Sequence, residues 1–579
     1  MSTRTFATDE AVQGQFRGAI TDVSWSIPPD SPQDDDLDLQ RMARAALNYL
    51  RGNPDPDRGY ECQFSLGPLG IPCQVPGVPP NQYGYDPISL GDTDARMSWQ
   101  YPHMRAMAGE SDPDPVELGV QQRIKSYLRE DHLCWLNPAA YVGQPIEGTW
   151  ATTWTGAKLM HLLAETYKRN GEQSIKQEAR DIFMALRRLA QWDGDRAYYM
   201  GIAPYKNGEW LTAGWCQQHS RNYPFIVEPC VRYWECTGDE EALDLARAFT
   251  EGFLAGIQPD QQELKIDPET GAFEGHTHLH THAIWGVAHL GAVLGEERYL
   301  EWARRVYEFV LANGTDYGWF PEHIPQVEWR AEICTVGDMT STAVWLARGG
   351  WPHYWDHVER IVRNTLRRCQ FFLTPQFLDL FRQLHKDEPE ETIEAALAEL
   401  QKLEGGFVAQ PAFDDWVGYP KTLGQAGMNT NGLQMMGCCP PEGMRGLWEA
   451  WQGVVEDKPE GVFVNMALSR DHPAAKVAAS RSKDGQVDIT ARKAASYLLR
   501  PPAWTDRATV RLLRNGQEQT IKWGGPAHAY LVNRAVDPGD VLVVKWAVPQ
   551  FAQEFTPISV PDRERTLTVR WAGNSVVGV

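Results

Sequence analysis

The sequence predicts a protein that is mainly α-helical and ends in an all-β part. Two observations lead to this fold class. A helical-hairpin pattern recurs through the first part of the chain, and short segments rich in β-branched residues follow it. Of the 579 residues, 42% are hydrophobic and 23% are charged, which is typical of a globular protein with a large core.

The hairpin pattern is an internal repeat. The stretches NGEQSIKQEARDIF, TGDEEALDLARAFT and LGEERYLEWARRVY each place Ala-Arg eight and nine residues after a glycine, and these glycines are Gly171, Gly238 and Gly295. Each glycine follows an apolar helical stretch and precedes an amphipathic one, so it fits the residue that ends a helix. Repeated helical hairpins indicate either a solenoid or a closed double ring of helices, an α/α toroid.

The β part is expected from about residue 456. Segments such as GVFVNMAL, QVDITA, DVLVVKWAV and TLTVRW alternate in polarity and are separated by Asp, Gly, Asn and Pro turns. This pattern is typical of an antiparallel β-sandwich. The predicted organisation is an N-terminal extension over residues 1–40 that packs on one of the other parts, a helical domain over 41–455 and a β-sandwich domain over 456–579.

The chain is acidic, with 76 Asp and Glu residues against 55 Lys and Arg residues and a net charge of -21. Nucleic acids and anionic membrane surfaces are held by clustered Lys and Arg, so neither is an expected partner. No stretch approaches the roughly 20 apolar residues of a membrane-spanning helix. The first residues, MSTRTFATDEAVQGQF, lack the features of a secretory signal, which predicts a cytoplasmic location. The oligomeric state stays open, with a homodimer as one option.

Two adjacent cysteines, Cys438 and Cys439, stand in the stretch MMGCCPPEGMR, directly before two prolines. Three interpretations are open: two small buried side chains, a strained disulfide between neighbours, or two thiolate ligands of one soft metal such as Zn²⁺. The disulfide does not suit a reducing compartment. A metal would need further ligands from elsewhere in the chain.

A second segment, RAEICTVGD, offers such ligands in Glu332 and Cys334. If this segment is extended, residues two apart point to the same side, so both side chains could face one point. With Cys438 and Cys439 they would give one oxygen and three sulfur ligands. The alternative is a surface glutamate and a core cysteine with no common role.

Histidines crowd the segment EGHTHLHTHAIWG, where His276, His278, His280 and His282 fall within seven residues. In a strand, alternate histidines share a face and could bind a metal, whereas in a helix they spread around its axis. Because the sequence nearby offers no obvious carboxylate ligand, hydrogen bonding to a polyhydroxylated ligand is the favoured role.

The segment GTDYGWFPEH mixes acids, glycines and aromatic residues, with Asp316 and Glu322 as its carboxyl groups. A loop of this kind can hold a carboxylic acid against an apolar wall, which raises its pKa toward that of a general acid. An ordinary solvated loop is the alternative.

Together, these segments resemble the β-L-arabinofuranosidases of glycoside hydrolase family 127 and its relatives. RAEIC resembles the family's Glu-x-Cys zinc segment, GCCPPEGMR its Cys-Cys-Pro-Pro segment with a downstream arginine, and HLHTH its active-site histidine segment. LLRPPAW, NG and PGD resemble its C-terminal β-sandwich. The cysteine pair, with Glu-x-Cys about a hundred residues upstream, is the most specific part of the likeness.

The resemblance implies an (α/α)6 barrel followed by an antiparallel β-sandwich. It implies a zinc-dependent retaining glycoside hydrolase that acts on β-L-arabinofuranosides or a related plant-cell-wall sugar. The implied ligands of Zn²⁺ are Glu332, Cys334, Cys438 and Cys439. Cys438 would be the nucleophile, as a metal-bound thiolate, while a carboxylic acid protonates the leaving oxygen and then activates water.

For this acid, the resemblance points to two residues. The family's glutamate lies 16 residues before the zinc glutamate, at the position of Asp316, and the nearest glutamate is Glu322. The family's asparagine after Cys-Cys-Pro-Pro is Glu442 in this chain, so the sugar pocket is expected to differ. The expected substrate-binding residues are His278, His280, His219, Glu228, Trp215 and Arg445.

Two other classes of function stay open. An α/α-barrel sugar epimerase or polysaccharide lyase would use His or Tyr acid–base chemistry without a metal-bound thiolate. A non-catalytic carbohydrate-binding protein would keep the zinc as a structural staple. In each case the expected partner is a carbohydrate, such as a small oligosaccharide or glycoside.

Overall fold

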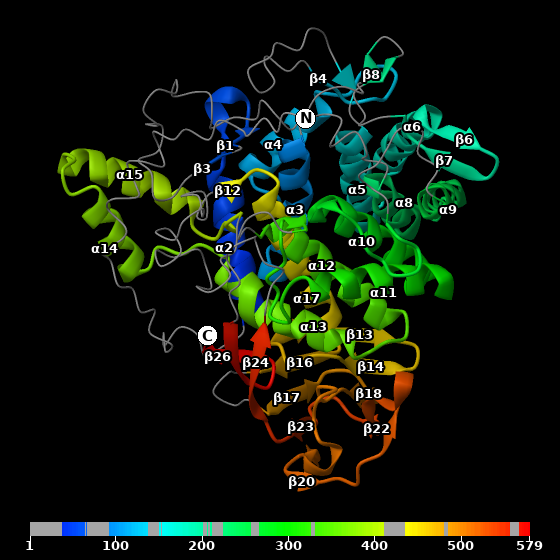
Figure 1. The fold of residues 1–579 in the computed structure, drawn as a ribbon, viewed down its shortest axis with the longest axis vertical. Coiled ribbons are helices and arrows are strands. Elements are labelled where there is room, and N and C mark those ends of the chain that lie inside the picture. Colours follow the sequence, from blue (N-terminus) through cyan, green and yellow to red (C-terminus); the bar gives the residue numbers. More distant parts are fainter. Residues whose placement is uncertain are drawn as a thin grey trace.

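A computed structural model of the chain is helix-rich first and β last, as the sequence predicts (Figure 1). The structure describes residues 38–63, 65–66, 92–136, 150–151, 153–200, 205–206, 209–210, 224–255, 266–325, 331–409, 435–479, 485–555 and 567–578. The C-terminal strands gather below the helices in Figure 1, and α14 and α15 project to one side.

Fourteen helices are labelled in the first part of the described chain. They are α2 (Leu39–Gly52), α3 (Asp92–Ala108), α4 (Pro115–Lys125), α5 (Thr153–Asn170), α6 (Gln173–Leu189), α8 (Pro224–Thr237), α9 (Glu240–Leu254), α10 (Thr277–Leu294), α11 (Glu297–Ala312), α12 (Ile333–Arg348), α13 (Tyr354–Ile361), α14 (Pro375–Leu384), α15 (Glu390–Leu403) and α17 (Cys439–Val454). A 3-10 turn, η2 (Pro56–Arg58), and a π-helical turn, η3 (Val362–Leu366), complete them.

Short strands lie between these helices. They are β1 (Pro54–Asp55), β2 (Glu61–Cys62), β3 (Ser65–Leu66), β4 (Trp135–Leu136), β5 (Trp150–Ala151), β6 (Gln191–Asp193), β7 (Arg196–Tyr198), β8 (Tyr205–Lys206), β9 (Glu209–Trp210), β10 (Gly275–His276), β11 (His323–Ile324) and β12 (Met435–Met436). Two of these strands, β10 and β11, pair with each other and help to build the candidate site described below.

Six helices contact one another in a cyclic order: α3, α5, α8, α10, α12 and α17. Each contacts the next, and α17 contacts α3 again, so the series closes on itself. Other helices pack mainly against one member of this series each, with α6 on α5, α9 on α8, α11 on α10 and α13 on α12. The hairpin repeat therefore alternates between a member of the cyclic series and a helix packed against it.

The two kinds of helix differ as their positions require. Side chains of α10 and α12 are buried on every side, from 277 to 291 and from 333 to 347. The buried residues of α6 instead form one stripe, which consists of Ala179, Ile182, Phe183, Ala185 and Leu186. An amphipathic helix covers a core with one face, whereas a helix buried all round lies within it. None of the described helices is both long and apolar enough to cross a membrane.

Glycines end the helices where the repeat predicts. Gly171, Gly238 and Gly295 have φ angles of 75°, 71° and 66°, and they follow α5, α8 and α10. The N–H groups of Gly171 and Gly238 each donate to a backbone carbonyl four residues earlier, at 2.7 Å. This left-handed backbone favours glycine because glycine has no Cβ. The predicted hairpin turns are confirmed.

The C-terminal strands follow α17 directly. They are β13 (Val455–Lys458), β14 (Gly461–Val464), β15 (Arg470–His472), β16 (Ala475–Ala478), β17 (Gln486–Ala491), β18 (Ala495–Leu499), β19 (Arg511–Arg514), β20 (Gln517–Glu518), β21 (Trp523–Gly524), β22 (Tyr530–Val536), β23 (Val541–Lys545), β24 (Gln550–Phe555), β25 (Leu567–Ala572) and β26 (Ser575–Gly578). The 3-10 turns η5 (Arg507–Thr509) and η6 (Pro526–His528) connect some of them. The sheet orders are β13-β14-β18-β22-β21, β15-β16-β17-β23-β19-β20 and β24-β25-β26.

Strand pairing differs from the sequence prediction at one position in the described sheets. All C-terminal pairs are antiparallel except β14 with β18, which run parallel with Val462 opposite Tyr497. The expectation of purely antiparallel pairing is therefore wrong there. Between β14 and β18 the chain forms β15, β16 and β17 of another sheet, and this crossover returns β18 in the direction of β14.

Buried polar contacts join the helices to the sheets. Arg500 donates to the carboxylate of Asp356 in α13 at 2.8 Å, and both side chains are almost fully buried. Arg363 of η3 donates to the carbonyl of Ala467 at 2.7 Å. Because an unpaired buried charge is strongly unfavourable, these pairs define how the two parts dock.

Candidate functional site

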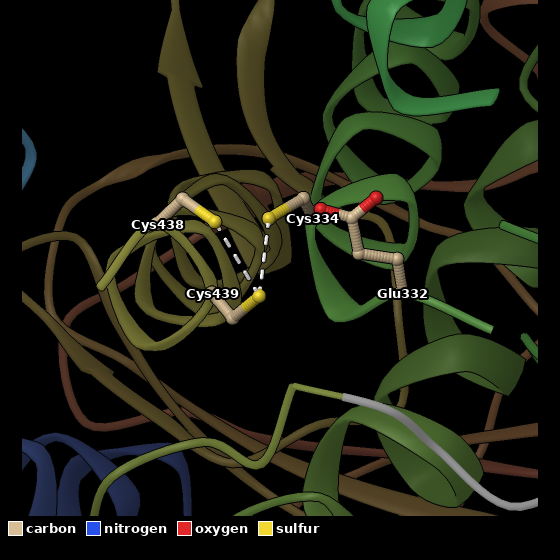
Figure 2. A group of neighbouring side chains, drawn as sticks. All are labelled: Glu332, Cys334, Cys438 and Cys439. Carbon is tan, nitrogen blue, oxygen red and sulfur yellow. Dashed lines mark hydrogen bonds between the residues drawn. The ribbon is translucent and has the colours of Figure 1, made fainter. Parts of the chain in front are cut away.

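Four side chains predicted as metal ligands meet at one point. One ligand atom each of Glu332, Cys334, Cys438 and Cys439 lies within 4.8 Å of all the others, and we call these four residues the cysteine group (Figure 2). The Sγ of Cys334 is 3.6 Å from that of Cys439, which is in turn 3.6 Å from that of Cys438. Two segments about a hundred residues apart are thus brought together.

Two helix starts position the group. Cys438 is the residue before α17, and Pro440 and Pro441 occupy the first turn of that helix. Proline suits this position because the first N–H groups of a helix have no partner within it. Glu332 precedes α12 with an extended backbone, whereas Cys334 already lies in the first turn. The expected fully extended Glu-x-Cys segment is therefore wrong, since the helix begins between the two residues.

The donor set fits a tetrahedral zinc-type ion. Zinc binds thiolate sulfur at about 2.3 Å, so two sulfurs of one tetrahedral site lie about 3.8 Å apart. The two measured Sγ–Sγ distances of 3.6 Å are close to this value. Three soft sulfur donors with one carboxylate are a set that zinc accepts and that Mg²⁺ or Ca²⁺ does not favour.

The three thiols differ in acidity. Hydrogen bonds from Cys334 and Cys439, with help from Arg96, hold the pKa of the Cys438 thiol well below its ordinary value. Burial raises the pKa of Cys334 and of Cys439. Cys438 is also partly exposed, while the other two are buried. The protein alone therefore favours a thiolate at Cys438, the most exposed of the three cysteines.

A histidine supports the carboxylate of the group. The Nε2 of His276 lies 2.7 Å from Glu332 Oε2. Burial raises the pKa of Glu332, but the His276 imidazole outweighs burial and brings it well below the ordinary value. Conversely, burial lowers the pKa of His276, and Glu332 and then Glu322 raise it above 6.5. Glu332 is thus held as a carboxylate, the form that binds metal.

The two candidate acids lie in different surroundings. Glu322 precedes β11, and its carbonyl accepts from Thr277 N–H at 2.8 Å beside the β10–β11 pair, where His276 stands opposite His323. Its carboxylate lies near enough to His276, the partner of Glu332, to raise the pKa of that imidazole. Asp316 instead accepts from Gln553 of β24 at 2.9 Å and lies 3.7 Å from Arg360.

The clustered histidines divide between two faces because their segment is helical from Thr277 onward. His278 and His282, one turn apart on α10, both face Asp338 of α12, with Nδ1 to carboxylate distances of 2.7 and 3.2 Å. The imidazole of His280 turns away, stacks on Phe273 at 3.9 Å and lies with its Nδ1 2.8 Å from the His276 carbonyl. The helical alternative in the sequence analysis is the one observed.

A chain of buried ion pairs, which we call the ion-pair chain, runs beside the cysteine group. Arg445 donates to Asp338 at 2.6 Å and to Glu442, and it also bonds Ser341. Arg96 joins Glu442 to Asp92, and Lys158 bonds the same aspartate. Its members are Lys158, Asp92, Arg96, Glu442, Arg445 and Asp338. Coulombic attraction from Arg445 and Arg96 outweighs burial and lowers the pKa of Glu442 to about 2.

Most members of the ion-pair chain were not predicted from the sequence. Asp92 and Arg96 stand four residues apart at the start of a helix that carries almost no amphipathic stripe. Charges on a helix buried all round are a signal of internal ion pairs, because an unpaired buried charge is costly. That signal could have identified Asp92, Arg96 and Asp338, although their partners depend on tertiary structure.

Of the other predicted binding residues, Glu228 is fully buried in α8, with Arg232 Nε donating to its Oε1 at 2.9 Å. Arg445 is 1% exposed, and its guanidinium lies 3.9 Å from the ring centre of Trp285. Trp215 and His219 lie outside the described residues.

Comparisons with known proteins give a fold likeness. No family model matches the chain, and no curated protein matches its sequence. Among solved structures, a glycoside hydrolase is 15% identical, with a TM-score of 0.54 over 84% of this chain and 77% of that chain. A family 127 β-arabinofuranosidase is 14% identical, with a TM-score of 0.54 over 97% of this chain and 82% of that chain. At these identities the likeness establishes that this chain shares the fold of these two enzymes.

Proposed function

We propose that the protein is a zinc-dependent retaining glycoside hydrolase with Cys438 as its nucleophile. The substrate class we propose is a β-L-arabinofuranoside or a related plant-cell-wall sugar. The observation that carries the proposal is the convergence of Glu332, Cys334, Cys438 and Cys439 at one point. The fold shared with a glycoside hydrolase and a β-arabinofuranosidase supports it.

The proposal includes an architecture. The closed cyclic order of α3, α5, α8, α10, α12 and α17 supports an (α/α)6 barrel, with the helices packed against them as its outer layer. The two larger C-terminal sheets contribute to one hydrophobic core and support a β-sandwich beside the barrel. We propose that residues 41–455 form the catalytic domain and residues 456–579 a supporting domain.

The residues of the cysteine group fit a bound zinc ion, with Glu332 as the oxygen ligand and the three cysteines as sulfur ligands. Such an ion would keep its thiolate ligands deprotonated near neutral pH. His276 would hold Glu332 in position through the 2.7 Å hydrogen bond, as a carboxylate-orienting partner outside the ligand shell.

Catalysis would begin at Cys438. This residue stands directly before α17, where the helix dipole and the nearby Arg96 favour a thiolate. Its sulfur attacks the anomeric carbon and forms a carbon–sulfur bond while the bond to the leaving oxygen breaks. Glu322, as the carboxylic acid, gives its proton to that oxygen, so the leaving group departs as an alcohol.

In the second step, the carboxylate of Glu322 takes a proton from water. The water oxygen attacks the anomeric carbon, the carbon–sulfur bond breaks and the Cys438 thiolate is restored. Two displacements at the same carbon retain its configuration. We assign this role to Glu322 rather than Asp316 because Glu322 acts on His276 beside the cysteine group, whereas Asp316 contacts β24.

The sugar would be oriented by His278. Its Nδ1 faces the Asp338 carboxylate at 2.7 Å, which fixes that nitrogen as the donor. Its Nε2 is buried and has no hydrogen-bond partner among the described residues. With its Nε2 unprotonated, the ring would accept a hydrogen bond from a sugar hydroxyl. Arg445 would act by positioning Asp338, because its guanidinium is already bound to Asp338, Glu442 and Ser341.

The test is hydrolysis of an aryl β-L-arabinofuranoside, with metal content measured in parallel. We expect the wild type to release the aryl alcohol and to yield the β-anomer first by NMR. Cys438→Ser should lower kcat/KM at least about 10³-fold. Cys369→Ala, which changes a buried free cysteine that is not a member of the cysteine group, is the matched control and should keep its activity.

Other results would favour the alternatives. Tight sugar binding without turnover by the wild type would indicate a binding protein with structural zinc. Conversion of a free sugar to its epimer, equally fast in Cys438→Ser, would indicate an epimerase. Hydrolysis that is unchanged in Cys438→Ser would overturn the proposed nucleophile.

A further inference from the structure

A second polar cluster lies inside the cyclic series of helices, and the proposed reaction does not use it. His103 of α3 and both His161 and Glu165 of α5 come together, next to Glu228 and Arg232 of α8, and we call these five residues the histidine cluster. His103 follows Arg96 of the ion-pair chain by seven residues on the same helix, or about 10 Å along its axis. The histidine cluster is therefore separate from the cysteine group.

Three side chains of this cluster have the geometry of metal ligands. One ligand atom each of His103, His161 and Glu165 lies within 4.8 Å of the others. Glu165 Oε2 is 2.8 Å from His103 Nε2, and Glu165 Oε1 is 3.3 Å from His161 Nε2. Ligands held at about 2.0–2.1 Å in a tetrahedral site are about 3.3–3.4 Å apart.

Three of the four ring nitrogens of these two histidines lack a hydrogen bond within the described chain. In the described part of the chain, neither nitrogen of His161 has a hydrogen-bond partner, and neither does Nδ1 of His103. Both residues are buried, at 1% and 3% exposure. A buried polar atom left in this state costs free energy, so native proteins almost always provide it with a partner.

A carboxylate stands behind one of the rings. Glu228 Oε2 lies 3.8 Å from His161 Nδ1, and it too has no hydrogen-bond partner among the described residues. A histidine that binds metal through one nitrogen usually directs its other N–H toward a carboxylate. A small rotation of His161 on binding a cation through Nε2 would complete this bond.

The rings are also fixed from the sides. The His103 ring stacks on Trp448 at 4.5 Å with an interplanar angle of 8°, and Trp99 meets His161 edge-on at 4.7 Å. Among the ion pairs of the described residues, Glu165 meets one arginine, Arg169, at 3.8 Å, and that side chain is 44% exposed. Glu165 itself is 15% exposed, so the cluster is not fully sealed from solvent.

We propose that His103, His161 and Glu165 form a second metal site for a zinc-type divalent cation, with Glu228 orienting His161. The site binds through nitrogen and oxygen, in contrast to the sulfur-rich cysteine group. It links α3 to α5 and, through Glu228, to α8. Its role is to stabilise the closed helix series.

Cobalt titration of the whole protein tests the proposal, because Co²⁺ reports its ligands. We expect the metal-free wild type to bind two equivalents of Co²⁺. One gives the intense near-ultraviolet band of a thiolate-to-cobalt charge transfer, and the other gives only the weak visible bands of nitrogen and oxygen ligands. His161→Gln and Glu165→Gln should each bind one equivalent and keep the thiolate band.

The matched control is His289→Gln. His289 is another fully buried histidine of the helix series. Neither of its ring nitrogens has a hydrogen-bond partner among the described residues, its Nε2 lies 3.2 Å from Glu235, and it belongs to no described group with metal-ligand geometry. This variant should still bind two equivalents. A wild type that binds one equivalent with the thiolate band, or a second equivalent that persists in both His161→Gln and Glu165→Gln, would overturn the proposal.

A measurement on the wild type covers the case in which His161→Gln does not fold. X-ray absorption of the Zn²⁺-saturated protein should show sulfur and imidazole scattering together. Sulfur scattering without imidazole would reject the second site and leave the cysteine group intact, whereas imidazole without sulfur would reject zinc at the cysteine group alone.

Discussion

The ion-pair chain and the histidine cluster both place polar side chains in the interior of the helices, but they satisfy these buried groups in different ways. In the ion-pair chain beside the cysteine group, cations and carboxylates alternate, and Asp92, Glu442 and Arg445 each meet two partners of opposite charge. In the histidine cluster, Glu228 shares Arg232 with Glu235 and Glu449, while the ring nitrogens of His161 have no hydrogen-bond partner in the described chain.

The difference indicates what each region needs in order to be stable. A buried charge is tolerated when its partners satisfy it, and a fully satisfied network is rigid. The ion-pair chain meets this condition with protein groups alone, so the proposed active site is held in place before any ligand arrives. The histidine cluster meets it only when a cation or protons are added.

The largest effect should come from breaking the ion-pair chain at Asp338. Asp338→Asn removes the charge that Arg445, His278 and Thr281 bind, and it should lower the free energy of unfolding by about 3–5 kcal/mol. Activity should fall as well, because His278 loses the group that fixes its tautomer. Urea unfolding and the aryl furanoside assay measure the two effects.

Asp356→Asn is the control for that experiment. Asp356 is also buried and binds Arg500, but it does so between the helices and the sheets. It should lose a similar free energy of unfolding while keeping its activity under conditions where it is folded. If both variants lose activity in proportion to stability, the special role of the ion-pair chain would be rejected.

The two clusters should lose their contributions to stability at different pH values. Burial lowers the pKa of His282, which faces Asp338, to about 4. The unfolded chain therefore binds a proton at this histidine more tightly than the folded chain does. Neutral His282 contributes fully to the free energy of unfolding above the ordinary pKa of about 6.5, and this contribution is lost as the pH falls from there to about 4. The expected loss is about 3 kcal/mol.

The histidine cluster should respond at lower pH. Burial raises the pKa of Glu165, but His103 and His161 outweigh burial and bring it well below the ordinary value. The contribution of ionised Glu165 to the free energy of unfolding is therefore present above about pH 4.3 and is lost only below that.

Urea unfolding at a series of pH values tests the prediction for His282. The free energy of unfolding should change less steeply with pH between 6.5 and 4 in His282→Gln than in the wild type. An unchanged slope would contradict the assignment to His282.

How far the sequence predicted each cluster depends on how local its signals are. Gly171, Gly238 and Gly295 were predictable because a left-handed helix end depends on neighbouring residues. The cysteine group was predictable because two segments each carry a recognisable part of it. The pairing of His278 with His282 depended on a helix starting at Thr277, which the alternation of histidines left open.

Contacts made across the fold were not predictable. Arg96 meets Glu442 across 346 residues, and nothing in either segment identifies the other. The parallel pairing of β14 with β18 follows from a crossover through another sheet, which local alternation does not record. His103 and His161 stand alone in their segments, so only the packing of α3 on α5 reveals the histidine cluster.

Adding Zn²⁺ should stabilise the folded protein, by a smaller free energy than the losses predicted above. A ligand at 100 times its Kd stabilises the folded state by about 2.7 kcal/mol per site. Thermal unfolding of the metal-free protein with added Zn²⁺ should therefore shift upward in two saturable steps. His161→Gln should lose one step and His289→Gln neither. A single step in the wild type would contradict the difference between the clusters.

The smallest effect should come from an ion pair outside both clusters. Lys493 Nζ lies 2.7 Å from Asp457, and their side chains are 51% and 33% exposed. Water already solvates such charges, so Asp457→Asn should change the free energy of unfolding by less than about 1 kcal/mol. Raising the salt concentration should reduce this difference further, since exposed charges are screened over about 8 Å at physiological ionic strength. The loss in Asp338→Asn should hardly depend on salt, because no solvent reaches that carboxylate. Equal salt dependence in both variants would mean that burial does not protect the ion-pair chain.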